Sequence, residues 1–139
     1  MNLANKVADK MINGDSFSKW LGIEILEINA NFCKLKLNVR KEMTNGFKIA
    51  HGGITYSLAD SCLAFAANAD GLKAVSIETS ISHTKKVNVG DTLTASSKQV
   101  NKSSKTALYY ITITNQDNLE VAHFKGTVYF TEKEWFPKS

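Results

Sequence analysis

The chain has 139 residues, a formal net charge of +4, 43% hydrophobic residues and 22% charged residues. A chain of this length can bury a core without metal or disulfide support, and we expect residues 1–139 to form a single domain. The cationic excess permits an anionic partner, but lysines are spread along most of the chain, so we expect no nucleic-acid partner. The near-average composition and the single proline argue against a repetitive or largely disordered protein.

Signals for targeting, metal binding and redox chemistry are missing from the sequence. Residues 1–15 are polar and interrupted, unlike the apolar core of a signal peptide. No apolar run reaches the roughly 18 residues of a membrane helix, so we expect a cytoplasmic protein without membrane contact. Cys33 and Cys62 lie in apolar patterns without spacing for a metal site or a redox pair, and we interpret both as buried reduced thiols.

The predicted elements begin with one or two short helices between residues 2 and 21, with Asp15 or Ser16 placed to cap a helix start. Extended patterns follow at residues 23–28 and 32–39, and the turn between them makes a hairpin. One long helical pattern begins near His51 and ends at Asp70-Gly71, where glycine suits a helix C-cap. Four more strands are predicted at residues 74–84, 91–100, 106–114 and 119–131.

This order of elements predicts an α+β fold. The short loops between the last strands imply antiparallel neighbours. One apolar stripe follows the long helix, through Ile54, Leu58, Cys62, Phe65 and Ala69. A six-stranded, curved antiparallel sheet wrapped around this helix would bury the stripe, so we expect the helix to form the core of the domain.

Two glycines open the long helix. Gly52 and Gly53 each lower helix propensity by about 1 kcal/mol relative to alanine, which indicates a reason outside the helix. Glycine at a helix N-terminus lets another molecule approach the unpaired backbone N–H groups, which can bind an anion or a developing oxyanion. A tight turn before the helix is the alternative explanation, and a lone glycine pair would favour it.

One acidic residue lies in the middle of the long helix. Asp60 shares a helix face with Tyr56, Ala64 and Ala67, opposite the apolar stripe, so a cleft of small residues could open beside it. If this acid is buried, its pKa should rise towards that of a useful general base. An ordinary exposed aspartate on a solvated face is the alternative.

Gly52 and Asp60 are too far apart to act on one carbonyl group. Eight residues separate them, which is roughly 12 Å along one helix at about 1.5 Å per residue. A reacting carbonyl must lie about 3 Å from its oxyanion donor and close to its base or nucleophile. Two antiparallel helices related by a two-fold axis would meet this requirement, so both roles together predict a homodimer with two composite sites.

Four other polar residues have side chains that could take part in chemistry. His51 precedes the glycines, where its side chain can hold the turn or donate to a carbonyl oxygen, and both roles stay open. Asn45 could orient a water or a carbonyl, although Asn-Gly is also a favoured turn pair. His83 and His123 lie in strand patterns without ligand spacing, and we interpret both as structural or surface residues.

Several short motifs follow one another along the chain: Asn45-Gly46, His51-Gly52-Gly53 and Ser57-Leu58-Ala59-Asp60, then Asn68, Gly71-Leu72, Ala74-Val75 and the later Gly90-Asp91-Thr92-Leu93-Thr94-Ala95. Taken together, these motifs resemble the phenylacetate-degradation branch of the hotdog-fold acyl-CoA thioesterases. The resemblance spans nearly the whole chain. It implies a hotdog fold in which protomers pair, with a homotetramer as the expected assembly.

The resemblance also implies roles for single residues. Asp60 would be the base or nucleophile, and the Gly52 N–H would form the oxyanion hole. Asn45 and His51 match positions that orient the carbonyl or the lytic water. Substrate contacts are expected from Gly53, Tyr56, Ser76, Lys85 and Lys86.

The implied substrates are aryl-acetyl, aryl and medium-chain acyl-CoA esters, hydrolysed without a metal or a bound cofactor. Two departures leave the preferred acyl group open. Lys85-Lys86 stands where relatives often carry Arg-Pro, which keeps positive charge for a CoA phosphate but loses a rigid turn. Gly14 stands where relatives can have a polar side chain near the acyl pocket.

Two other functions are compatible with the same fold. A hotdog hydratase or dehydratase would need a histidine base in an Asp-x-Asn-Pro-x-His setting, and that motif is absent from the sequence. A non-catalytic acyl-CoA sensor would use a similar cleft and basic rim. Such a sensor normally carries an output domain, and no helix-turn-helix pattern accompanies this one.

Overall fold

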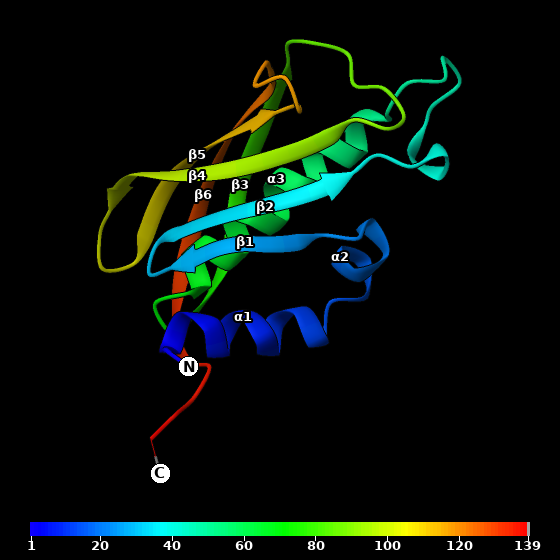
Figure 1. Cartoon of the computed structure of the whole chain (residues 1–139). Coiled ribbons are helices and arrows are strands. Elements are labelled where there is room, and N and C mark those ends of the chain that lie inside the picture. Colours follow the sequence, from blue (N-terminus) through cyan, green and yellow to red (C-terminus); the bar gives the residue numbers. More distant parts are fainter. Residues whose placement is uncertain (139) are drawn as a thin grey trace.

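The structure, a computed structural model, describes residues 1–138. Two helices and a hairpin come first, followed by a long helix and four strands (Figure 1). In chain order the elements are α1 (Leu3–Asn13), α2 (Ser16–Leu21), β1 (Glu24–Asn29), β2 (Phe32–Asn38), the 3-10 helix η1 (Lys41–Met43), α3 (Gly52–Asn68), β3 (Leu72–His83), β4 (Thr92–Lys102), β5 (Thr106–Thr114) and β6 (Glu120–Glu134).

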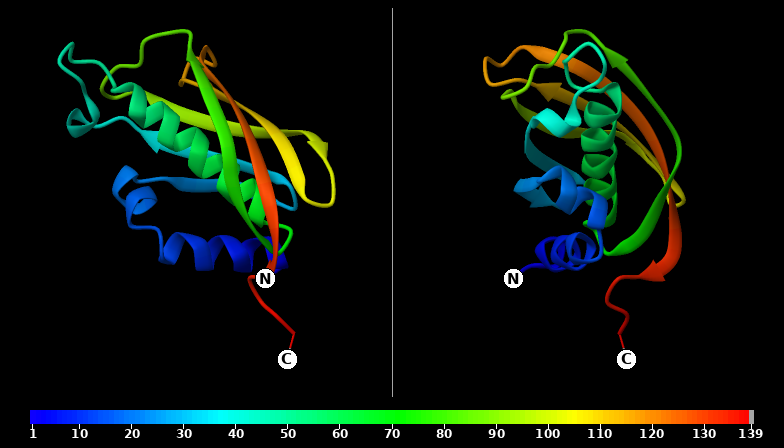
Figure 2. Two further views of the ribbon diagram at one scale, coloured as in Figure 1. Left: turned by 180° about the vertical axis from the view of Figure 1, so that it is seen from behind. Right: turned by 90° about the vertical axis from the view of Figure 1, so that its right-hand side faces the viewer.

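The six strands form one antiparallel sheet in the order β1-β2-β4-β5-β6-β3. Figure 2 shows this sheet curving around α3, while α1 and α2 lie near the β1 end of the molecule. The predicted α+β hotdog architecture is confirmed. Strands β1 and β3 are the two edges of the sheet, and β3 runs beside α3 and pairs with only one neighbour, β6.

Helix α3 is the centre of the core, as predicted. All five residues of the predicted apolar stripe are buried. Gly126 on β6 allows the helix to approach the sheet, because an added Cβ would lie 2.6 Å from Leu63 Cδ2. Ala67, which the sequence placed on the face of Asp60, is only 1% exposed and belongs to the core instead. The helix is thus buried on more of its circumference than the stripe suggested.

The predicted end of the long helix was wrong by a few residues. Helix α3 ends at Asn68, and its C-cap is Ala69 in a right-handed conformation rather than Gly71. Gly71 instead adopts φ +111° in the turn that leads into β3, a conformation that favours glycine. The Asn68 carboxamide accepts the Ala74 N–H at 2.8 Å and so closes this turn with a side chain.

The two cysteines are free and buried, as predicted. The Cys62 thiol donates to the Cys33 carbonyl at 3.3 Å, and burial raises the pKa of Cys62 well above its usual value. Within residues 1–138, no three His, Cys, Asp or Glu side chains are placed to hold a metal ion. No helix in this part of the chain is long and apolar enough to cross a membrane.

Candidate active site

The first turn of α3 leaves one backbone donor free. His51 is the N-cap residue, and its Nδ1 accepts the Gly53 N–H at 2.8 Å. The His51 carbonyl accepts the Ile54 N–H at 2.9 Å. Among residues 1–138, the Gly52 N–H has no hydrogen-bond partner. Because the helix dipole also favours negative charge here, the Gly52 N–H is suited to an oxyanion, whereas the Gly53 N–H is already occupied.

Two imidazole rings explain why both positions in this turn are glycine. A Cβ on Gly53 would lie 3.0 Å from His51 Nδ1, and a Cβ on Gly52 would lie 3.2 Å from His83 Cε1. His83 Nε2 is 2.7 Å from Thr55 Oγ1, which donates to the Gly52 carbonyl at 3.0 Å. His83 is therefore part of the glycine turn and not simply a strand residue, which the sequence did not reveal. The turn is held from two sides.

Asn45 stabilises the loop that precedes α3. Its Oδ1 accepts the Phe47 N–H at 2.9 Å and the Ile49 N–H at 3.4 Å, while its backbone N–H donates to the Ile49 carbonyl. The turn-forming role of Asn45 is thus present in the structure. The Asn45 side chain also lines the hollow beside Gly52.

The hollow beside Gly52 is basic, and we call it the lysine hollow. It has a volume of about 390 Å³. Its walls are formed by Asn45, Ile49, Ala50, Gly52, Thr55, His83, Thr84, Lys85, Lys86 and Val87. The structure therefore brings Asn45, Gly52 and the Lys85-Lys86 pair to one place, although these residues are widely separated in the sequence.

Asp60 lies on the outward face of α3, beside two smaller hollows. The first, the Ser61 hollow, has a volume of about 220 Å³; its walls include Asp15, Phe17, Tyr56, Asp60 and Ser61. The second, the Ser76 hollow, has a volume of about 250 Å³; its walls include Asp60, Ala64, Val75 and Ser76. Tyr56 and Ser76 therefore each line a hollow that also contains Asp60. The Tyr56 hydroxyl is hydrogen-bonded to Thr79 on β3.

The Asp60 carboxylate is partly desolvated even though the residue is exposed in the single chain. Burial by the surrounding helix and strand atoms raises its pKa above the ordinary aspartate value. No neighbouring negative charge contributes to the higher pKa, since desolvation is its only cause. An acid with a raised pKa at the edge of a hollow is a candidate general base.

The predicted residues fall into separate groups within one chain. Gly52 faces the lysine hollow, whereas Asp60 faces the Ser61 and Ser76 hollows. His51 and Gly53 face a further hollow of about 300 Å³, which we call the aromatic hollow; its walls are Phe17, Trp20, Glu42, Met43, Thr44, His51, Gly53, Ile54 and Ser57. His123 lies elsewhere, on β6, where Nε2 is 3.4 Å from Glu120 Oε1.

The antiparallel sheet wrapped around one long helix is the hotdog architecture, and here that helix carries a glycine turn and an acid. A family model described as the thioesterase superfamily matches residues 47–122, which include the glycine turn, α3 and β3. The chain belongs to this superfamily.

Comparison with individual proteins places the chain in the PaaI-like acyl-CoA thioesterase family. It is 37% identical over 119 residues to the acyl-coenzyme A thioesterase PaaI of Escherichia coli, covering 86% of this chain and 85% of that protein. The solved structure of E. coli PaaI aligns with a TM-score of 0.92 over 94% of this chain and 95% of that one, at 34% identity. The family resemblance seen in the motifs is confirmed.

Two further relatives extend the comparison. A putative esterase of Archaeoglobus fulgidus is 37% identical over 137 residues, which is 99% of this chain and 89% of that protein. A Streptococcus mutans protein whose structure was solved bound to acetyl CoA aligns with a TM-score of 0.77 at 27% identity, covering 81% of this chain and 90% of that one.

Proposed function

We propose that the protein hydrolyses acyl-CoA thioesters to the free acid and CoA at a composite site shared by two protomers. In this site the Gly52 N–H of one protomer holds the thioester carbonyl, and Asp60 of the other protomer attacks it or activates a water molecule. The observation that carries the proposal is the pairing of a free helix N-terminal donor with a desolvated carboxylate on the same helix. The acyl-CoA thioesterase activity of the related E. coli PaaI supports it.

The composite arrangement is supported by the separation of the two groups. Gly52 and Asp60 are eight residues apart on continuous α3, which is roughly 12 Å along the helix axis. The two residues also face different hollows. A carbonyl bound at Gly52 is therefore out of reach of Asp60 in the same chain, so the partner must supply the acid.

Strand β3 offers the surface on which the partner would dock. It is an edge strand of twelve residues, and its Val75 and Ile77 side chains are 55% and 59% exposed. A long edge strand with exposed apolar side chains readily pairs with a strand of another chain, because its backbone N–H and C=O groups are unpaired. Antiparallel pairing of β3 with its copy would create a two-fold axis beside the Ser76 hollow, which contains Asp60. We propose a homodimer formed in this way, with two dimers assembling into a tetramer.

The remaining predicted residues have roles in this scheme. His51 fixes the turn that presents the Gly52 N–H, and Asn45 orients the carbonyl or the lytic water from the wall of the lysine hollow. Lys85 and Lys86 attract the phosphates of CoA into that hollow. As a base, the acid takes a proton from the water that adds to the carbonyl carbon, and the C–S bond then breaks to release the CoA thiol. As a nucleophile, it forms an anhydride with the acyl group while the C–S bond breaks, and water then hydrolyses the anhydride to the free acid and the original carboxylate.

Replacing Asp60 by Asn tests the chemistry directly. Release of the CoA thiol from a panel of phenylacetyl-, benzoyl- and straight-chain CoA esters should fall by roughly 10²- to 10⁴-fold in kcat, the range typical of a lost acid–base group. Binding of the same esters should be retained. Asp9→Asn on the exposed surface of α1 is the matched control and should leave kcat unchanged. Unchanged turnover in Asp60→Asn would refute the role of Asp60, and no hydrolysis by the wild type would favour a sensor.

Mixing two inactive variants tests the composite site. A dimer of an Asp60→Asn chain and a Gly52→Val chain contains one site with both native groups, because the acid and the donor come from different chains. After random exchange of protomers, roughly a quarter of the wild-type activity should return. A site built within one chain would give no recovery. Sedimentation provides a second check, since an active enzyme that is strictly monomeric would contradict the dimer.

A further inference from the structure

Two aromatic side chains stand exposed beside the glycine turn. Phe17 and Trp20, both on α2, are 53% and 48% exposed. Their ring centroids are 6.2 Å apart and their planes differ by 13°, so the rings are stacked. Both line the aromatic hollow, with Met43 and Ile54 as further apolar walls. Exposed apolar surface of this kind in a hollow commonly marks a ligand-binding site.

The glycine turn separates two hollows of different chemistry. Gly52 lines the lysine hollow, and its neighbour Gly53 lines the aromatic hollow. A thioester carbonyl likewise joins two different arms, a highly charged CoA and an acyl group. With the carbonyl oxygen on the Gly52 N–H, the charged arm fits the lysine hollow and an apolar acyl arm fits the aromatic hollow. A volume of about 300 Å³ is at the lower end for small-molecule sites, which suits one arm of the substrate.

We propose that the stacked Phe17–Trp20 pair binds the acyl group of the substrate. Arg40, which holds Trp20 of this pair, makes the site selective for aryl and medium-length apolar acyl groups. This inference rests on the proposed thioesterase function. Phe17 also lines the Ser61 hollow, and Ser57 lines both hollows. Phe17 thus borders both hollows, whereas Trp20 lines the aromatic hollow alone.

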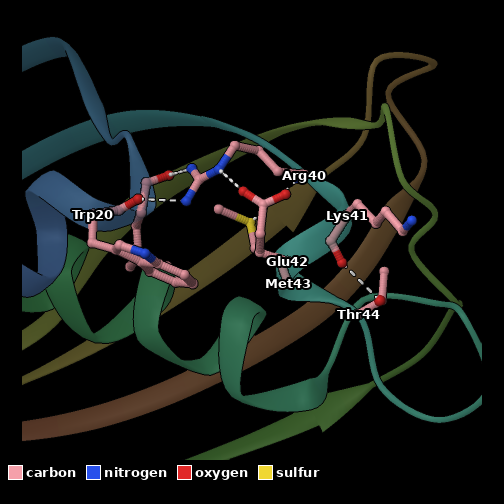
Figure 3. A network of polar contacts seen from close by, with 7 residues as sticks. Trp20, Arg40, Lys41, Glu42, Met43 and Thr44 are labelled. Atoms are coloured by element: carbon pink, nitrogen blue, oxygen red, sulfur yellow. Dashed lines mark hydrogen bonds and ion pairs between the residues drawn. The ribbon is translucent and has the colours of Figure 1, made fainter.

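Arg40 holds Trp20 in place through the backbone of α2 (Figure 3). Its Nη2 donates to the Trp20 carbonyl at 2.7 Å, and its Nη1 donates to the Leu21 carbonyl at 3.2 Å. The guanidinium carbon lies 4.9 Å from the centre of the Trp20 ring, a cation–π contact. Gly22 follows with φ +75°, and a Cβ there would lie 3.4 Å from Arg40 Nη1.

The remaining nitrogen of the Arg40 guanidinium, Nε, contacts a residue of η1. Arg40 Nε donates to Glu42 Oε2 at 3.3 Å. A backbone hydrogen bond and the Arg40 guanidinium hold the pKa of Glu42 below its usual value, so this carboxylate is ionised at neutral pH. Arg40 thus ties the end of α2 to the loop that enters α3. Trp20 is consequently pre-organised before a substrate arrives, which makes it able to discriminate between acyl groups.

Selectivity is measured as the ratio of kcat/KM for phenylacetyl-CoA to that for acetyl-CoA, because both esters share the CoA arm. Trp20→Ala and Phe17→Ala should each lower this ratio about tenfold or more, since one missing methylene in an apolar pocket already costs roughly 10- to 200-fold. Trp20→Phe should restore most of the ratio. Arg40→Lys keeps the charge but not the fork, and should lower the ratio by a smaller factor. Tyr110→Ala, on the outer face of β5, should leave it unchanged.

A binding measurement separates the acyl seat from effects on folding. Trp20 and Trp135 are the two tryptophans of the chain, so Trp135→Phe combined with Asp60→Asn reports on Trp20 alone in a protein that binds without turnover. Phenylacetyl-CoA should shift the Trp20 emission, and acetyl-CoA should not. Equal shifts of the Trp20 emission with both esters would overturn the inference. So would a selectivity ratio within twofold of wild type in Trp20→Ala and Phe17→Ala. In either case a wild type that hydrolyses acyl-CoA esters would still support the thioesterase function. Failure of the thioesterase function would show earlier, as a wild type without hydrolysis.

Discussion

The two ends of α3 differ in whether their polar groups are hydrogen-bonded within the protein. At the N-terminal end the Gly52 N–H has no partner among residues 1–138, and hollows lie on both sides of the turn. At the C-terminal end Asn68 is 3% exposed and every polar atom of its carboxamide is bonded. One end is open to a ligand, and the other is closed by the protein itself.

The contrast shows how one helix can serve both stability and function. Burying an unpaired donor is costly, so an open N-terminus is tolerated only where water or a substrate can reach it. A closed C-terminus compensates by joining α3 to β3 and to the segment after β6. We expect substitutions at the closed end to act on stability and substitutions at the open end to act on rate.

The largest effect is expected from Asn68→Ala at the closed end. Asn68 Nδ2 donates to the carbonyls of Ala64 and Ala74, and its Oδ1 accepts from the Ala74 N–H and from Trp135 Nε1. Alanine would remove all four hydrogen bonds and leave partly buried partner groups without Asn68, which should cost about 2–4 kcal/mol and lower the Tm by roughly 10 °C. Thermal unfolding followed by circular dichroism measures this loss.

In Asn68→Ala the Tm should fall, whereas the catalytic rate should not. Measured well below the Tm, kcat should remain close to that of the wild type, because the glycine turn lies at the opposite end of the helix. Asn115 provides the control, since it is also buried but, among residues 1–138, its side chain accepts only from the N–H groups of Asp117 and Leu119 in its own turn. Asn115→Ala should cost less. A large loss of kcat in folded Asn68→Ala would break the division between the two ends.

The second effect concerns Gly53→Ala at the open end. Alanine is favoured over glycine in a helix by about 1 kcal/mol, but the new Cβ would lie 3.0 Å from His51 Nδ1. The two effects oppose each other, so stability should change little, while displacement of the turn should lower kcat about tenfold. Gly46→Ala, in the preceding loop, is a close control because its Cβ would meet nothing within 4 Å. Equal kcat values for the two variants would argue against a catalytic role for the turn.

The sequence allowed most of the fold to be predicted, because it depends on local pattern. Strand alternation, one long apolar helix and the short connections are visible within windows of ten to twenty residues. The helix C-cap was misplaced because Asn68 is held by Trp135, a partner 67 residues away. A contact of that range leaves no trace in the pattern around Gly71, where glycine serves a positive φ and not a cap.

The site was predictable to the extent that its chemistry lies on α3. Gly52 and Asp60 depart from what a buried helix requires, and their spacing predicts a site shared by two chains, which stays a prediction. His83 was missed because the pairing of β3 with β6 decides where its ring lies. Phe17 and Trp20 were missed for a related reason, since their pattern was equally compatible with burial, and only the path of α2 leaves them exposed.

Two variants distinguish a His51 that only holds the turn from one that also acts on the substrate. His51→Ala should lose the N-cap hydrogen bond to the Gly53 N–H, at a cost of about 1 kcal/mol. His51→Asn should recover this stability, because asparagine is among the best N-cap residues. If His51 only holds the turn, kcat should recover together with the Tm. Recovery of the Tm without recovery of kcat would show that the imidazole also acts on the substrate.

The smallest expected effect is a pH-dependent change in the Tm, which arises from Asp60 in the middle of α3. Its pKa is raised by burial in the folded chain, so the folded state prefers the protonated form. The resulting stabilisation is fully present below the unfolded-state pKa of about 3.9 and is lost as the pH rises through the folded-state pKa. Asp60→Asn should therefore unfold at a higher temperature than wild type at neutral pH, and this advantage should vanish in strong acid.

The kcat of the wild type should rise over the same pH window, since only the ionised carboxylate acts as a base or nucleophile. Thermal scans of both chains from acid to neutral pH, with Asp9→Asn as the control for a lost carboxylate, would contradict this account if the difference in Tm stayed constant.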